Sequence, residues 1–542
     1  MGRSAQTRES GTFSDADKQG PLAAGNLSLG NPVFLLSLIL VCGFSLRVWH
    51  TGFGYPAVLH PDEWAKYRVV KRIVGGLNPE YFQHPGFLVN SAAIVVKLSQ
   101  PLFGADRPFF DVLWPARFWV VILGTLTLVP VFFLTRAVYG SAAACLASAF
   151  LAVSPMHVVH SRYVKEDVPL VLFVCLSLWG LICWMRTGNG KAGWGWFALA
   201  VAGAALSLAS KFVGALALIL LVGTVLSGKA SWKRKTIVVL SSCLGAAVVF
   251  LLASPQVLYW EVTRPNFLYE LGRGVKGPGY GPLLRIHEWP DWGTYFFVHG
   301  LGPGLTWPIC LVGTVGMVQA LRGLRKEPGA LLLAITALAW YLLAELTPQK
   351  LNMDSERYVM PALAILCPLG AGWLWARIEH KRFRYYLIPI LLIFPLAQTL
   401  LINLNLEPDT RTTASQWLRE EGPREPFQFL EYNTTYRGVE SPYAKWVPGS
   451  IHAPKEVFEQ NLRQADALVI SSFHTDRYER ARHRSRFELD RLEQARKVFP
   501  YGIVFQKPAF VTTGFHHPRV ELYFRRPYPG AQETAVPGKR GF

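Results

Sequence analysis

Cysteine is scarce in this sequence and is confined to its most apolar parts. All seven cysteines lie within long hydrophobic runs, and none of them has the C-x-x-C spacing of a metal or redox site. We therefore interpret them as buried packing residues rather than as disulfides or metal ligands. The polar C-terminal part also lacks a glycine-rich phosphate loop and an internal repeat.

Ionisable side chains are rare inside those hydrophobic runs. The chain has 542 residues, of which 51% are hydrophobic. Uncharged runs of about 17–25 residues, the length that crosses a hydrocarbon core, recur along it. This pattern predicts a polytopic α-helical membrane protein. Channels and secondary transporters more often carry ionisable residues near the membrane midplane, whereas Lys211 and Glu345 here lie at the ends of runs.

Positive charge in the short loops predicts how the chain crosses the membrane. Residues 1–31 are expected to be a disordered cytoplasmic tail, and about eleven spans are expected within 32–404 if residues 84–103 lie along the interface. The basic loops then share the side of the N-terminus, which the positive-inside rule makes cytoplasmic. If 84–103 spans instead, those loops change sides. This distribution explains the net charge of +19 without a nucleic-acid partner.

The remaining segments are predicted to emerge on the outer face of a plasma or inner membrane. They include a first loop over residues 50–113 and the C-terminal residues 405–542. In the latter, strand-like and helical patterns alternate, which predicts a small extracytoplasmic α/β domain. The expected strands cover residues 427–432, 465–471, 502–506 and 520–524.

Two adjacent carboxylates, Asp62 and Glu63, stand in the first outer loop after His60 and Pro61. Adjacent acids in a loop are usually only solvated. Here a proline stiffens the approach, and aromatic residues flank the pair. A carboxylate held in this way can act as a general base towards an acceptor hydroxyl, while the other could orient the acceptor or hold a metal. Lys66 and the basic residues after it are interpreted as a segment that lies along lipid headgroups.

A second polar cluster separates two later spans. His157 and His160 could bind a metal, although simple hydrogen bonding explains them more easily. Glu166 and Asp167 either cap the helix that follows, where acids suit the helix dipole, or reach the same cavity as Asp62.

Two cations are candidate phosphate ligands. Arg357 precedes a late span and could grip a lipid phosphate with both arms of its guanidinium, but an interface anchor explains it equally well. Lys211 lies in a tight turn between two apolar runs, where either a phosphate partner or snorkelling to the interface accounts for it.

Several stretches resemble, in order along the chain, motifs of a known family. Asp62-Glu63 followed by His84-Pro85 resembles a DE…HPP arrangement, with Gly86 in place of the second proline. SPMHVVHSRYVKEDVPLVLF resembles the family's second loop, and LASKFVGAL, SERYVMPALAIL and the segment after Asp409 resemble later motifs. The resemblance runs from about residue 33 to 420. It is to GT-C fold, polyprenyl-phosphate-sugar-dependent glycosyltransferases, in the branch of protein O-mannosyltransferases and lipid A aminoarabinose transferases.

The resemblance implies a seven-span core and an inverting sugar transfer on the outer face. The donor would be a polyprenyl-phosphate sugar and the acceptor a hydroxyl of a protein, a lipid or a glycan. It also implies that Asp62 is the base and that Arg357 and Lys211 lie near the donor phosphate. Metal use differs across the superfamily, so the cofactor stays open and no metal ligands are predicted.

The sequence therefore nominates two sets of residues. The candidate catalytic residues are Asp62, Glu63, Glu166 and Asp167, and the candidate substrate-binding residues are His60, His84, Arg162, Lys211, Glu356 and Arg357. A transporter or flippase of lipid-linked sugars is the alternative function, and a family member without catalysis that acts as a structural partner is a third.

Overall fold

A computed structural model describes most of the chain. The described residues are 31–55, 58–80, 83–103, 110–188, 190–276, 292–323, 327–347, 354–377, 381–431, 438–448, 451–480, 482, 485–509, 514 and 516–533.

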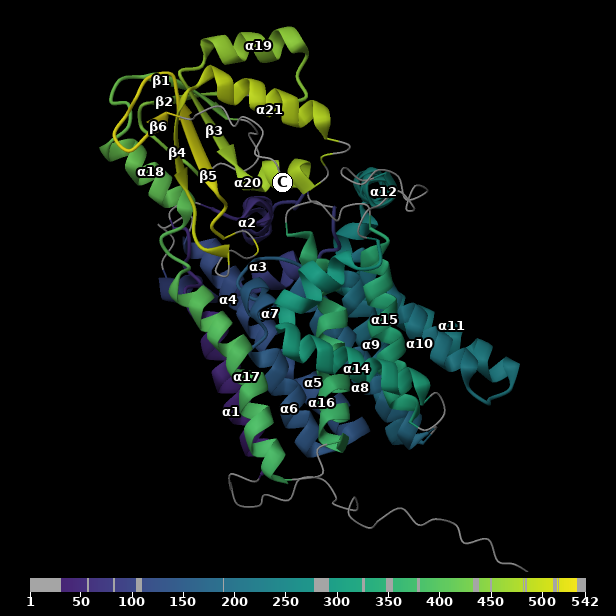
Figure 1. Ribbon diagram of the computed structural model, residues 1–542. Coiled ribbons are helices and arrows are strands. Elements are labelled where there is room, and N and C mark those ends of the chain that lie inside the picture. Colours follow the sequence, from purple (N-terminus) through teal and green to yellow (C-terminus); the bar gives the residue numbers. More distant parts are fainter. Residues whose placement is uncertain are drawn as a thin grey trace, which may run out of the picture.

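Most of these residues form a bundle of apolar helices, from one end of which a smaller sheet domain rises (Figure 1). The apolar helices are α1 (Pro32–Val48), α3 (Phe87–Phe103), α4 (Phe110–Leu126), α5 (Leu128–Tyr139), α6 (Ser141–Ala152), α8 (Asp167–Thr187), α9 (Lys191–Ser210), α10 (Ala215–Ser227), α11 (Trp232–Ala253), α14 (Trp307–Arg322), α15 (Pro328–Glu345), α16 (Met360–Arg377) and α17 (Lys381–Leu404). Further helical elements connect them: α2 (Pro61–Val74), α7 (Pro155–His160), η2 (Phe212–Gly214), η3 (Pro255–Leu258), α12 (Trp260–Lys276), η5 (Phe296–Leu301), α13 (Gly302–Leu305) and η6 (Ser355–Val359).

The helices confirm the polytopic membrane class. Seven of them, within the part of the chain that is described, are long and apolar enough to cross a membrane. The pair Phe296–Leu305 and Trp307–Arg322, bent by 113°, would make an eighth. The other three predicted spans, near residues 32–48, 141–158 and 212–228, are shorter apolar helices, so the total of eleven stays a prediction.

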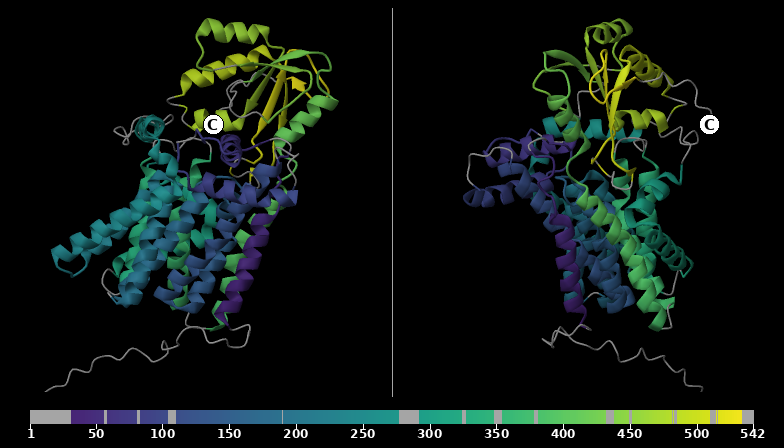
Figure 2. Two further views of the ribbon diagram at one scale, coloured as in Figure 1. Left: turned by 180° about the vertical axis from the view of Figure 1, so that it is seen from behind. Right: turned by 60° about the vertical axis from the view of Figure 1, so that its left-hand side comes forward.

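Two helices lie across the end of the bundle that faces the sheet domain (Figure 2). One is α2, which carries the paired carboxylates, and the other is α3, which packs against it. The segment that the sequence predicts to lie along the interface, residues 84–103, corresponds to α3. The interfacial position of this segment stays a prediction.

Close packing of α8 and α9 brings two candidate residues to the same end of the bundle. A Cβ atom on Gly203 would lie 2.6 Å from the backbone nitrogen of Ser177, so only glycine allows this approach. Asp167 begins α8, and Lys211 follows directly after the end of α9. Because the two helices run in opposite directions, these residues meet.

The C-terminal part is a six-stranded mixed sheet with helices on both faces, which confirms the predicted small α/β region. Its strands are β1 (Phe427–Glu431), β2 (Ala444–Pro448), β3 (Ala467–Ser471), β4 (Tyr501–Phe505), β5 (Val520–Phe524) and β6 (Gln532–Glu533). They are arranged in the order β2-β1-β3-β5-β4-β6. β1 pairs in parallel with β2 and β3, and the other pairs are antiparallel.

Two hydrophobic cores hold the helices to this sheet. α18 (Thr410–Glu420) covers one face through Ala414 and Leu418, which pack with Phe429 and Leu522. α19 (Lys455–Gln464) and α21 (Arg486–Val498) cover the other face, and α20 (Ser472–Arg480) follows β3. The sheet domain joins the bundle through the connection from α17 to α18.

Candidate active site

The start of α2 presents Asp62 at the end of the bundle. Pro61 occupies the first helical turn, and Nδ1 of His60 accepts a hydrogen bond of 3.2 Å from the Asp62 backbone N–H as the helix cap. The Asp62 side chain is 46% exposed. His60 is fully buried and its ring lies 4.5 Å from that of Tyr163. Asp62, the predicted base, is therefore half-exposed to solvent in the first turn of a helix whose N-terminus is capped by His60.

Its neighbour Glu63 has a different environment. Glu63 is fully buried and forms a two-armed ion pair with Arg117, with distances of 2.9 Å from Nε to Oε1 and 2.7 Å from Nη2 to Oε2. Oε1 also accepts from the Val164 backbone N–H at 2.9 Å. Arg117 in turn donates to the carbonyl oxygens of Thr51 and Phe53. Both Glu63 oxygens are thus engaged inside the protein, a geometry that suits a positioning residue, and the catalytic role of Glu63 stays a prediction.

Cations surround the exposed carboxylate. Lys165 Nζ contacts Asp62 Oδ2, and Arg357 Nη2 lies 4.0 Å from the same oxygen. Both cations are buried, with side-chain exposures of 6% and 9%. Burial alone would raise the pKa of Asp62, but Lys165, His60 and Arg357 together hold this pKa well below its usual range.

Arg357 links this carboxylate to two further acids. Its Nε lies 3.2 Å from Asp167 Oδ2, and its Nη1 donates to Asp354 Oδ2 at 2.9 Å. Lys211 Nζ donates to the other Asp167 oxygen at 2.7 Å. Four residues nominated from the sequence therefore meet in one cluster: Asp62 of α2, Asp167 of α8, Lys211 directly after α9, and Arg357 of η6.

Glu166 and Lys66 complete the cluster. They form an ion pair in which both side chains are 2% exposed. This corrects the interpretation of Lys66 as a residue lying along headgroups, because it faces the interior one helical turn after Asp62. His84 is also close: burial and the nearby charges of Lys66, Lys211 and Lys165 hold its pKa well below the ordinary value.

Two nominated residues have other partners. Arg162 is fully buried and donates to the carbonyl oxygens of Leu46 and Arg47 and to the side chain of Asn403. It thereby links the second loop to α1 and α17, and its contact with substrate stays a prediction. Glu356 is half-buried and accepts from the Tyr295 hydroxyl at 3.2 Å.

Sequence reasoning missed three members of the cluster. Lys165, Lys66 and Asp354 were not nominated, yet each pairs with a nominated residue. The spacing of Lys66, four residues after Asp62, places both on one helical face and could have revealed it. Asp354 has a left-handed backbone (φ 57°) before η6 and also lies 3.3 Å from His160 Nε2, contacts that local sequence does not encode.

Metal ligation has no preformed centre in the described part of the chain. No group of three or more His, Cys, Asp or Glu side chains there is arranged to hold an ion. His157 Nδ1 lies 2.9 Å from Arg47 Nη2, and His160 faces Asp354. The two histidines thus have separate protein partners, and hydrogen bonding accounts for both.

Comparison with known families finds a match over part of the chain. Residues 95–260 match the family described as dolichyl-phosphate-mannose-protein mannosyltransferase. The matched segment contains Glu166, Asp167 and Lys211 and ends before Arg357. A comparison with curated proteins finds no match.

Solved structures share the fold over most of the chain. An Archaeoglobus fulgidus oligosaccharyltransferase tethered to an acceptor peptide has a TM-score of 0.53 at 15% identity, with 93% of this chain and 76% of that one covered. AglB of the same organism, with an inhibitory peptide and a dolichol-phosphate, has 0.51 at 14%, with 90% and 74% covered. ArnT of Cupriavidus metallidurans, bound to undecaprenyl phosphate, has 0.46 at 17%, with 94% and 99% covered. The two oligosaccharyltransferase structures, both with TM-scores above 0.5, show that the chain has the GT-C fold.

The geometry predicts that neutralising the two adjacent acids changes the stability of the fold by different amounts. Glu63→Gln leaves Arg117 buried beside a neutral partner and should cost about 3–5 kcal/mol of unfolding free energy. Asp62→Asn removes a half-exposed carboxylate and should change stability far less. Thermal unfolding of the two purified variants beside wild type measures this difference. Equal destabilisation by both changes would contradict the structural role of the Glu63–Arg117 pair.

Proposed function

We propose that this chain transfers a sugar from a polyprenyl-phosphate donor to an acceptor hydroxyl at the membrane face on which the sheet domain lies. The observation that carries the proposal is one half-exposed carboxylate, Asp62, set among buried cations at the end of the bundle. The basic loops of the sequence support an outer, extracytoplasmic position for this face.

The cations suit the donor phosphate. Arg357 offers a planar fork that matches phosphate oxygens, and Lys211 and Lys165 offer compact charges. All three are at present paired with carboxylates, so a bound phosphate would share or replace those partners. His84 lies within electrostatic reach of the same position. A lipid chain attached to this phosphate would run along the apolar helices.

The proposed reaction is a direct displacement at the anomeric carbon. The acceptor oxygen forms a bond to that carbon from the face opposite the phosphate, so the configuration inverts. The bond from the anomeric carbon to the phosphate oxygen breaks, and its electron pair leaves with the polyprenyl phosphate. The acceptor proton passes to Asp62. Fixed cations stabilise the charge that grows on the leaving phosphate, which is commonly the largest contribution to such catalysis.

The contact between Lys165 and Asp62 explains why the donor would have to bind before Asp62 can act as a base. While Lys165 lies on Asp62, the carboxylate is stabilised as an anion and is a weak base. A phosphate that draws Lys165 and Arg357 towards itself would let the pKa of Asp62 rise, which strengthens the base. Asp167 and Glu166 then act as positioning residues, because each holds a lysine at the edge of the site.

The acceptor class stays open between a protein, a lipid and a glycan. A transporter of lipid-linked sugars remains the alternative function. It would use ionisable groups near the membrane midplane, whereas the cluster described above lies at one end of the bundle.

The central test is transfer by reconstituted protein from a panel of polyprenyl-phosphate sugars. Wild type should release polyprenyl phosphate in a sugar-dependent reaction, and Asp62→Asn should abolish that release while the protein stays folded. Glu80→Gln is the matched control, because Glu80 is an exposed carboxylate of the same loop that pairs with Arg72 outside the cluster. Release by Asp62→Asn at a rate near that of wild type would refute the assigned base. Movement of the lipid across the bilayer without any release would establish the transporter.

The Lys165 contact predicts a shift in pH dependence. Loss of the cation in Lys165→Gln removes a charge that lowers the pKa of Asp62, so this pKa rises. The acid limb of kcat/KM, which reports the free enzyme, should then move to higher pH, and affinity for polyprenyl phosphate should fall roughly tenfold or more. Lys97→Gln, which changes an exposed lysine on α3, is the control. An unmoved acid limb together with unchanged affinity would remove Lys165 from the mechanism.

A further inference from the structure

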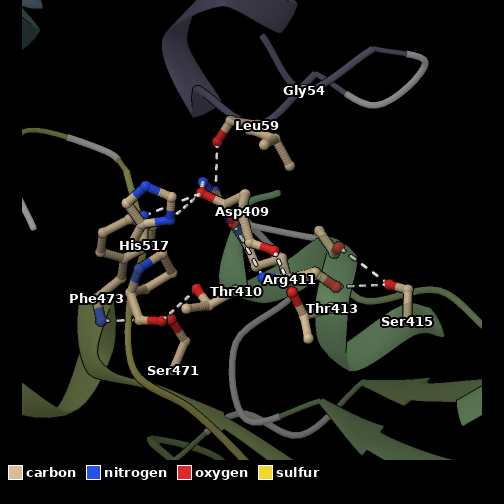
Figure 3. A network of polar contacts seen from close by, with 12 residues as sticks. Gly54, Leu59, Asp409, Thr410, Arg411, Thr413, Ser415, Ser471, Phe473 and His517 are labelled. Atoms are coloured by element: carbon tan, nitrogen blue, oxygen red, sulfur yellow. Dashed lines mark hydrogen bonds and ion pairs between the residues drawn. The ribbon is translucent and has the colours of Figure 1, made fainter. Parts of the chain in front are cut away.

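A buried ion pair between Asp409 and Arg411 lies at the start of the sheet domain and contacts a residue outside it (Figure 3). Asp409 caps α18, and its Oδ1 accepts from the backbone N–H and the Nε of Arg411 at 3.0 and 2.7 Å. Its Oδ2 accepts from Arg411 Nη2 at 3.1 Å and from the His517 backbone N–H at 2.9 Å. Both side chains are nearly inaccessible to solvent. These contacts fix the guanidinium in a single orientation.

The remaining arm of Arg411 leaves the domain. Its Nη1 donates to the Leu59 carbonyl oxygen at 2.7 Å, across 352 positions of sequence. Leu59 directly precedes His60, the residue that caps α2 and bonds to the Asp62 backbone. Gly438 lies against Arg411, where a Cβ would come within 2.4 Å of its Cδ. The sheet domain therefore holds the backbone at Leu59, two residues before Pro61, where α2 begins.

A second contact between the domain and the site runs through aromatic rings. His516, just before β5, is buried with its ring centroid 4.7 Å from Phe53 and 5.4 Å from Tyr163. The Tyr163 ring lies 4.5 Å from His60. This path meets the first one at His60, although it begins on a different segment of the domain. Two contacts, one from Arg411 and one from His516, thus converge on the cap of α2.

We infer that the sheet domain positions the catalytic carboxylate, with Arg411 and His516 as positioning residues for Asp62. The inference rests on the proposed function, since it assigns these residues to the same site. Lys165 and Arg357, which belong to the bundle, contact the Asp62 side chain, whereas Arg411 of the sheet domain bonds to the backbone three residues before it. A small displacement of a reacting group can lower the rate by roughly 10²-fold.

A purely internal role for Arg411 is the simpler alternative, and the domain contains a residue that illustrates it. Arg491 is also buried, and its Nη1 donates to the carbonyl oxygens of Ile451 and Ala453 at 2.7 and 2.5 Å. Both of those acceptors belong to the sheet domain itself. Arg491 is therefore a matched control: a buried arginine with carbonyl partners that holds the domain together without reaching α2.

The experiment compares Arg411→Lys with Arg491→Lys in the full-length reconstituted protein. Hydrogen–deuterium exchange over residues 59–67 needs no substrate, so it tests the positioning even if the transferase assay fails. Arg411→Lys should speed exchange there and lower kcat roughly 10- to 100-fold, with affinity for undecaprenyl phosphate changed less than about twofold. Arg491→Lys should lower the unfolding temperature of the domain and leave exchange at residues 59–67 and kcat near wild type.

His516→Leu repeats the test without touching the ion pair and serves if Arg411→Lys does not fold. It should raise exchange in the same segment and lower kcat in the same direction. The inference would be overturned if Arg411→Lys or His516→Leu only lowered the unfolding temperature. In that case exchange at residues 59–67 and kcat would both stay at their wild-type values. If the wild-type protein transfers no sugar but the variants still show faster exchange at residues 59–67, the proposed function is refuted. The positioning of this segment by the sheet domain is then upheld.

Discussion

The pair between Glu63 and Arg117 is the constraint on which the arrangement of the site depends. It buries two opposite charges with complementary two-armed geometry, and Glu63 also accepts from the Val164 backbone. Asp62 is the neighbour of Glu63, and Lys165 is the neighbour of Val164. The bond between Glu63 and Val164 therefore places Asp62 of the first loop beside Lys165 of the second loop. The ion pairs of Lys165 with Asp62 and of Lys66 with Glu166 join the same two loops beside this junction.

Charge balance explains how so many ionised groups can lie together at the end of an apolar bundle. Lys66, Lys165, Lys211 and Arg357 alternate with Asp62, Glu166, Asp167 and Asp354. Buried charges are tolerated where partners and hydrogen bonds offset their lost hydration. A site arranged in this way can accept an additional anion by exchanging partners rather than by bringing in new charge. This is the property that a phosphate-dependent transferase requires.

The membrane class and most strands could be predicted from the sequence, but the contact partners of the site residues could not. Long uncharged runs predicted the helical membrane class, and alternating patterns placed four of the six strands close to β1, β3, β4 and β5. β2 and β6 were not predicted: β6 has only two residues, and β2 ends in Pro448, a residue type that strands rarely contain. Likewise, Asp62 and Arg357 could be nominated because their residue types suit the chemistry, whereas the structural roles of Glu63 and Arg162 depend on contacts with residues far away in the chain. No local pattern specifies those contacts.

The most direct measurement of the central claim is a structure of the reconstituted protein with undecaprenyl phosphate bound. The account predicts a phosphate within about 3 Å of nitrogen atoms of Arg357 and Lys211, with Lys165 turned from Asp62 towards it. A phosphate bound away from these residues, or a Lys165 that stays on Asp62 in the complex, would contradict the proposed link between donor binding and the base.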